Sequence, residues 1–173
     1  MKREYIMLLA GVLLTALSCH AQQQEIDRTT VKTLDVKRYM GRWYELARYD
    51  HSFERGLERC EAFYTLLPDG KIEVRNTGIR EKDGTRHTSI GKAKPGKHPG
   101  QLRVSFFLFF YSDYNILALG ENYDWVLVGS RSPRYLWILS RTPSLPDKTL
   151  NHIVDIARER GYNTSKLIWV KQK

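Results

Sequence analysis

The chain has 173 residues, a formal net charge of +9 and a pI of about 9.6. This length suits a single domain with a sizeable core. The one long apolar run, near the N-terminus, is too short to cross a membrane comfortably as a helix. The sequence therefore excludes a protein built from membrane-spanning helices.

The first residues have the pattern of an export signal. Lys2 and Arg3 form a charged start, and residues 6–17 are apolar. Ala16-Leu17-Ser18 is followed by Cys19, and this stretch resembles the lipobox of bacterial lipoproteins, where that cysteine becomes the lipidated first residue. Ordinary signal-peptidase cleavage after Ala21 is the alternative.

Export decides how the positive charge is interpreted. An exported protein rarely meets nucleic acid, so we expect no nucleic-acid partner and favour attraction to anionic lipid head groups. A solvated surface without a partner is the alternative. The predicted organisation is a signal peptide over residues 1–18, a polar tether over residues 19–36 and a folded domain over residues 37–173.

Short runs rich in aromatic and β-branched residues follow Gly41, separated by turn signals such as Pro68-Asp69-Gly70. Eight runs predict strands over residues 43–49, 59–67, 71–77, 88–94, 101–106, 114–119, 125–130 and 135–141. Short strands joined in sequence by tight turns predict an all-β fold, an eight-stranded antiparallel up-and-down β-barrel. A two-sheet sandwich is the competing architecture.

One helix is expected after the strands. Pro146-Asp147 gives a start signal, apolar residues recur at helical spacing from Leu150 to Ala157, and Gly161 ends the segment. A helix with a single apolar stripe is predicted to pack outside the barrel wall. Residues 167–170 are predicted to form a final strand.

Three residues predict how one end of the barrel closes. Gly41 allows a tight turn of the backbone, and Trp43 brings a large ring into the floor. Arg141, almost a hundred residues later, can lay its guanidinium over that indole as a cation–π contact. An ordinary strand start with a core tryptophan is the alternative for the first two.

Signals for catalysis or cofactor binding are missing from the sequence. It contains no glycine-rich phosphate loop, no Cys or His pair at metal spacing and no nucleophile elbow. We therefore expect no catalytic residue, no metal and no cofactor. Two alternatives stay open: a lipid-modifying or isomerising enzyme that uses Cys60 or His51, and an envelope interaction module with a filled core.

Five motifs lie in order along the chain, at residues 39–45, 53–58, 104–107, 112–114 and 135–143. Together they resemble the lipocalin family, and within it the bacterial outer-membrane lipocalins and apolipoprotein D-like relatives. The resemblance implies a barrel closed at one end that binds small hydrophobic molecules, with a fatty acid, phospholipid or lysophospholipid as ligand. It also implies an outer-membrane lipoprotein facing the periplasm through a lipid anchor on Cys19, or a soluble periplasmic protein without that anchor. A homodimer is left open.

Strand alternation predicts which side chains face the ligand. Trp43 is taken as inward, and in the second strand the set with Cys60 is chosen over the set with Glu61 because it leaves room for an acyl chain. The predicted ligand-binding residues are Glu45, Ala47, Phe53, Cys60, Ala62, Tyr64, Val104, Phe106, Phe109 and Tyr114. Close packing of these positions without a cavity is the alternative. If Cys19 is acylated, Cys60 is a lone, buried thiol.

Residues 106–111, Phe-Phe-Leu-Phe-Phe-Tyr, break the alternation where a polar loop is expected. Counting strand directions from Trp43 places this loop at the open end of the barrel. The sequence predicts a ligand entry path there, with membrane or dimer contact as a secondary role; a loop folded inward as a plug is the alternative. Arg55, Arg131 and Arg134 are candidates to meet a lipid head group at this end, or are solvated surface charges.

Overall fold

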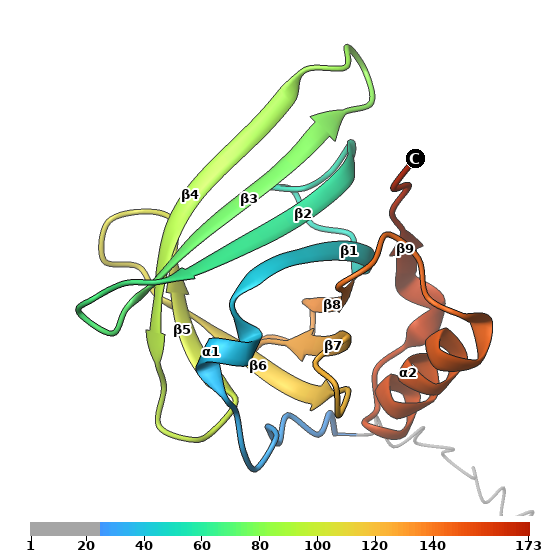
Figure 1. The fold of residues 1–173 in the computed structure, drawn as a ribbon. Helices are drawn as coiled ribbons and strands as arrows, with labels where there is room; N and C mark the ends of the chain where they lie inside the picture. Colours follow the sequence, from blue (N-terminus) through green and yellow to red (C-terminus); the bar gives the residue numbers. More distant parts are fainter. Residues whose placement is uncertain (1–24) are drawn as a thin grey trace, which may run out of the picture.

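Residues 25–173 are described by the computed structural model, so the predicted signal peptide and Cys19 lie outside the described residues. One antiparallel sheet dominates the described chain (Figure 1). The elements are α1 (Val36–Tyr39), β1 (Gly41–Tyr49), β2 (Leu57–Leu66), β3 (Ile72–Arg80), β4 (Arg86–Pro95), β5 (Gln101–Ser105), β6 (Ser112–Leu119), β7 (Trp125–Gly129), β8 (Leu136–Ser140), α2 (Asp147–Glu159), a short 3-10 turn (Thr164–Lys166) and β9 (Leu167–Trp169).

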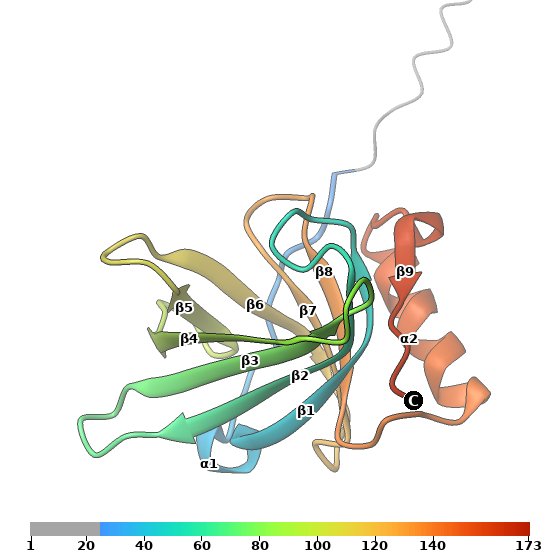
Figure 2. The same cartoon turned by 90° about the horizontal axis from the view of Figure 1, so that it is seen from above.

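The sheet closes on itself. Strands β2 to β8 pair in sequence order, and β1 pairs with both β8 and β2. This arrangement confirms the eight-stranded up-and-down barrel and excludes the two-sheet sandwich. Because β1 begins at the closed end, the loops after β1, β3, β5 and β7 lie together at the open end (Figure 2).

The closed end is built by α1 and by a late arginine. Asp35 caps α1, because its carboxylate accepts hydrogen bonds from the Lys37 and Arg38 amides at 2.9 and 3.2 Å. The Trp43 indole is fully buried and donates to the carbonyl of Tyr39 at 2.8 Å. Sequence patterns alone did not predict α1, which is too short to show a helical period.

The predicted stacking of Arg141 on Trp43 is present. The guanidinium carbon of Arg141 lies 3.8 Å from the centre of the indole. Gly41 adopts a φ of +89°, a conformation that glycine accepts without strain, and its Cα faces the Arg141 guanidinium. Gly41, Trp43 and Arg141 therefore meet at one point of the barrel base.

Two cores share the strands between them. The inner core fills the closed half of the barrel around Trp43 and Tyr64, while the outer core lies between the barrel wall and α2. Ile153 and Ala157, which recur on one face of α2, are fully buried in the outer core. The helix therefore packs outside the barrel, as predicted, and neither described helix is long and apolar enough to cross a membrane.

β1 changes partners halfway along its length. Residues 41–44 pair with β2, whereas residues 47–49 pair with β9. A β-bulge between Glu45 and Ala47 marks the change. Gln172 bridges the gap that opens between β1 and β2. Its side-chain amide donates to the backbone carbonyls of Glu45 and Cys60 at 2.6 and 3.0 Å.

The described part of the predicted tether, residues 25–36, lies against the barrel rather than free of it. The amide of Val31 donates to the carbonyl of Ile116, and the amide of Asp27 donates to that of Arg160, both at 2.9 Å. Val31 and Leu34 pack on the inner core. The sequence did not predict this packing, because the segment is mostly polar and its few isolated hydrophobic residues show no periodicity.

Candidate functional site

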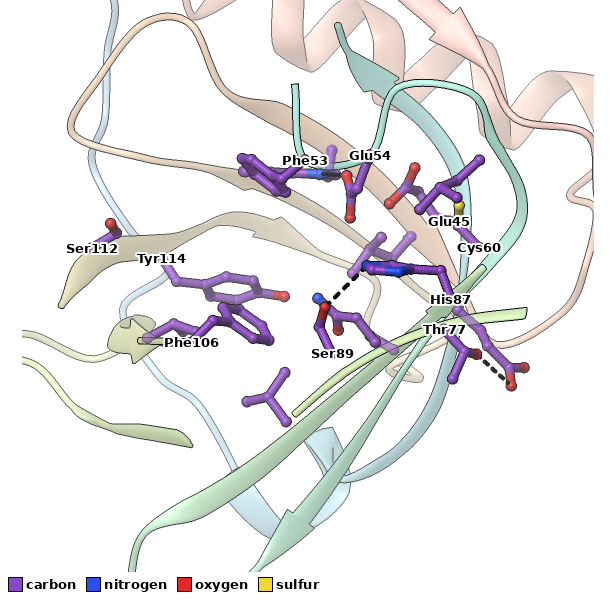
Figure 3. A pocket seen from close by; sticks show the side chains of 18 of the residues that line it. Glu45, Phe53, Glu54, Cys60, Thr77, His87, Ser89, Phe106, Ser112 and Tyr114 are labelled. Carbon is purple, nitrogen blue, oxygen red and sulfur yellow. Dashed lines mark hydrogen bonds between the residues drawn. The ribbon is translucent and has the colours of Figure 1, made fainter. Parts of the chain in front are cut away.

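A cavity of about 460 Å³ lies inside the open half of the barrel (Figure 3). This volume falls within the range of about 300–1,000 Å³ typical of small-molecule sites. Its walls are mostly apolar, and no lysine or arginine is among the residues that line it: Glu45, Phe53, Glu54, Leu57, Cys60, Glu61, Ala62, Tyr64, Val74, Asn76, Thr77, His87, Ser89, Val104, Phe106, Phe107, Phe110, Ser112, Tyr114, Trp137 and Leu139.

Strand β2 presents the predicted set to the cavity. Cys60, Ala62 and Tyr64 line it, and Phe63 between them is half-exposed on the outer wall. The bulk of Tyr64 lies towards the closed end, whereas the small Cys60 and Ala62 leave open space above it. The small inward residues predicted on this strand therefore border the open space of the cavity.

Ala47 is a correction to the predicted site. The β-bulge after Glu45 adds one residue to β1 and reverses which side the following positions face. Ala47 is fully buried in the outer core beside α2, and it does not line the cavity. Arg48 takes the inward place instead and reaches back to Glu45.

Phe106 and Phe109, both predicted to bind the ligand, lie in different places. Phe106 lines the cavity, and its ring lies so close to Gly91 that a Cβ on that glycine would come within 2.7 Å of it. Phe109 is 86% exposed and does not line the cavity, which corrects its assignment to the ligand site. A tight turn at the loop tip points this side chain into solvent. Its loop neighbours Phe107 and Phe110 do line the cavity.

Three tyrosine hydroxyl groups meet below the cavity. The Tyr114 hydroxyl lies 2.7 Å from that of Tyr39 and 3.0 Å from that of Tyr64. Burial raises the pKa of all three phenols, so they stay protonated. Tyr64 and Tyr114 also line the cavity, so its floor carries hydroxyl groups that are already engaged with one another.

A buried ionic cluster forms one wall of the cavity. The Arg48 guanidinium donates to Glu45 Oε1 at 2.6 Å and to the backbone carbonyls of Glu54 and Leu57 at 2.8 and 3.1 Å. These bonds fix the β1–β2 loop over the open end. Figure 3 shows Glu45 and Glu54 side by side at the cavity wall.

Glu45 sits in conditions that favour its neutral form. Burial, together with the nearby carboxylate of Glu54, raises the pKa of Glu45 to about 8, despite the attraction of Arg48. Glu54 Oε2 accepts a hydrogen bond from the indole N–H of Trp137 at 3.1 Å, and it lies 2.9 Å from His51 Nε2. His51 is itself stacked on Phe53, with ring centres 3.9 Å apart.

The surroundings of Cys60, one of the two residues considered for catalysis, disfavour its reactive form. Burial, together with the charges of Glu45 and Glu54, raises the pKa of the Cys60 thiol well above its ordinary value, so the reactive thiolate is suppressed. Cys60 is a free, buried cysteine. Within residues 25–173, no group of three or more His, Cys, Asp or Glu side chains is placed to hold a metal.

Several lining residues escaped the sequence prediction for identifiable reasons. His87 and Ser89 alternate on β4, as do Trp137 and Leu139 on β8, so a period of two was available to find them. Their polar or mixed character concealed that period. Glu54 lies in a loop and has no periodic signal, and its place is known from its contacts in the structure, such as the bond from Trp137.

The arginines expected at the open end are engaged in different ways. Arg55 pairs with Asp50, and Arg131 pairs with Asp113 at 3.0 Å, while Arg134 is exposed and its backbone and side chain both donate to the Ser132 hydroxyl. None of the three lines the cavity.

Comparison with known proteins shows which family the chain belongs to. A family model described as a lipocalin-like domain matches residues 34–172. Outer membrane lipoprotein Blc from Escherichia coli strain K12 is 42% identical over 158 residues, which cover 90% of this chain and 89% of that protein. The chain belongs to the lipocalin family.

Two further proteins resemble the chain at lower identity. Apolipoprotein D from Mus musculus is 35% identical over 181 residues, covering 97% of this chain and 93% of that protein. The solved structure of the cockroach allergen Per a 4 is 23% identical, with a TM-score of 0.69 and coverage of 86% and 96%. That likeness shows the fold. Lipocalins are in general binding and transport proteins, so the family implies that the cavity takes a small hydrophobic ligand.

Proposed function

We propose that this lipocalin binds and carries single-chain lipids, fatty acids or lysophospholipids, at the bacterial cell envelope, and that it does so without chemistry. The observation that supports the ligand class is the cavity, which is apolar on most of its wall and open at one end. Ten methylene groups buried there would contribute about 8 kcal/mol before association costs, enough for micromolar binding.

The acidic groups of the wall indicate which way the lipid enters. Glu45, Glu54 and Glu61 line the cavity without a lysine or arginine among the lining residues. A lipid carboxylate or phosphate seated deep inside would face these acids and lose its hydration. The acyl chain therefore goes inside, and the anionic group stays at the open end, near the exposed Arg134.

Filling the cavity tests the ligand proposal. Val104→Trp places an indole in the space for the acyl chain, and lipid affinity is expected to fall at least about tenfold. Thr65→Trp, on the exposed outer face of β2, is the matched control. Mass spectrometry of lipids that co-purify, followed by titration with a fatty acid and a lysophospholipid, measures the effect. Equal affinity in a folded Val104→Trp variant would show that lipids bind elsewhere.

The anchor is a second part of the proposal. A lipid on Cys19 would hold the protein at the outer membrane, as the name of the Escherichia coli relative states for that protein. Cys19→Ala is expected to move the protein from the membrane fraction to the soluble fraction. A wild-type protein that is already soluble, with Gln22 as its first residue, would instead establish cleavage after Ala21.

A further inference from the structure

The loop between β5 and β6 displays hydrophobic side chains to solvent in an unbroken run. Phe106, Phe107, Leu108, Phe109 and Phe110 are 45, 67, 61, 86 and 75% exposed. The loop projects from the barrel at its open end (Figures 1 and 2). An exposed apolar patch of this kind marks a contact surface, because leaving apolar side chains in water is unfavourable unless a partner covers them.

The exposed rings are held in place by an ordered turn. The amide of Phe110 donates to the carbonyl of Phe107 at 3.2 Å, and the Ser105 hydroxyl donates to the same carbonyl at 3.3 Å. Leu108 at the tip adopts a φ of 47°, which a leucine accepts only with strain. The rings of Phe107 and Phe110 lie parallel, 6.3 Å apart. The turn therefore presents the tip outward instead of allowing it to collapse onto the barrel.

Basic residues accompany the hydrophobic tip. Lys94 places its ammonium 4.5 Å from the ring centre of Tyr111, at the base of the loop. Arg131 and Arg134 project from the neighbouring β7–β8 loop, and both are exposed. Asp113, the nearby acid, is held by Arg103 and Arg131 together, so it leaves an excess of positive charge there.

We propose that the open end of the barrel docks on an anionic lipid bilayer, with Leu108 and Phe109 in the interface between head groups and acyl chains. A convex hydrophobic tip with a basic surround matches such a surface, which is apolar below a layer of negative charge. The described chain also begins at the edge of the barrel where the open-end loops lie (Figure 2). Cys19 precedes Glu25 by six positions, a reach of at most about 20 Å, so an anchored protein could hold this end at the membrane.

The same loop joins the docking surface to the cavity. Phe106, Phe107 and Phe110 line the cavity while remaining partly exposed. A lipid leaving the docked bilayer can therefore pass along these rings into the barrel without crossing water. This transfer role rests on the proposed function, whereas docking itself requires no ligand in the cavity.

Vesicle flotation tests docking with the mature chain carrying Cys19→Ala, which removes any anchor. The docking variant is Leu108→Asn with Phe109→Ser, because neither residue lines the cavity and asparagine tolerates the backbone at position 108. The matched control is Phe63→Ser with Ile90→Ser, which removes two exposed apolar side chains from the outer wall. Vesicles of phosphatidylethanolamine with one quarter phosphatidylglycerol are compared with pure phosphatidylcholine.

The protein with the unmodified loop is expected to float with the anionic vesicles, and less of it should float at about 0.5 M salt. The docking variant is expected to partition onto these vesicles at least about tenfold less. The control variant is expected to float normally. Lipid titration of the docking variant should be unchanged, which separates docking from ligand binding. Equal flotation of all variants would overturn the proposal, as would a docking variant that floats normally but loses a dimer on sizing, since a second copy would then cover the loop.

Discussion

Glu45 places a titratable carboxyl group inside a cavity that is otherwise mostly apolar. Its raised pKa means that the folded protein keeps a proton which the unfolded chain gives up. The carboxyl group can thus lie beside Glu54 in the cavity wall without adding a full charge of its own. Arg48 completes the arrangement by tying Glu45 to the β1–β2 loop.

This raised pKa predicts a pH-dependent stability. The ordinary value is 4.5 and the folded value is about 8, so the contribution of Glu45 is fully present below pH 4.5 and is lost as the pH rises to about 8. The free energy of unfolding should fall by at most about 1.4 kcal/mol per pH unit in that window. Urea denaturation of Glu45→Gln between pH 5 and 8 should show a flatter dependence. The exposed Glu159→Gln serves as control, and equal slopes in wild type and Glu45→Gln would contradict this account.

At the scale of elements, Arg141 contacts three segments with one guanidinium. Besides stacking on Trp43 of β1, it donates to the carbonyls of Arg38 in α1 and Arg42 in β1, each at 2.7 Å. It also donates to the carbonyl of Tyr123, after β6, at 3.2 Å. The planar fork of arginine suits this set of acceptors, and a lysine ammonium does not.

Removing this junction should destabilise the base. Trp43→Ala is expected to lower the free energy of unfolding by about 3–5 kcal/mol, because it leaves a large cavity in the core. Arg141→Ala is expected to lower it by about 2–4 kcal/mol, since it leaves backbone carbonyls without donors. Arg141→Lys should fall between wild type and alanine. Denaturant unfolding measures all three, and a lysine variant as stable as wild type would show that charge alone is sufficient.

Period-two patterns predicted the strands and much of the cavity wall, because alternation persists wherever a strand is regular. Cys60, Ala62 and Tyr64 follow from it directly. Ala47 does not, because a bulge adds one residue and no local signal in β1 announces it. The facing of Phe109 depends on a turn with strained backbone, which hydrophobicity alone does not reveal.

At the scale of the whole molecule, sequence patterns could not predict how residues 25–35 pack against the barrel. Residues 25–35 bind across β6 and the end of α2 through contacts between residues far apart in the chain. Such contacts depend on the finished barrel and leave no periodicity in the segment itself. The packing of this segment fixes the point at which the chain leaves the barrel (Figure 2).

The bridge between β1 and β2 has a consequence for the order of folding. Val170 donates its amide to Leu46, Lys171 accepts from Arg59, and the side chain of Gln172 spans both strands. The two bonds of Gln172 join residues 127 and 112 positions apart, whereas β2 to β8 pair with their neighbours in sequence. Closing so long a loop costs more entropy than closing a hairpin, so the successive hairpins can form before the bridge does. The first strand of the barrel therefore gains its last partner late in folding.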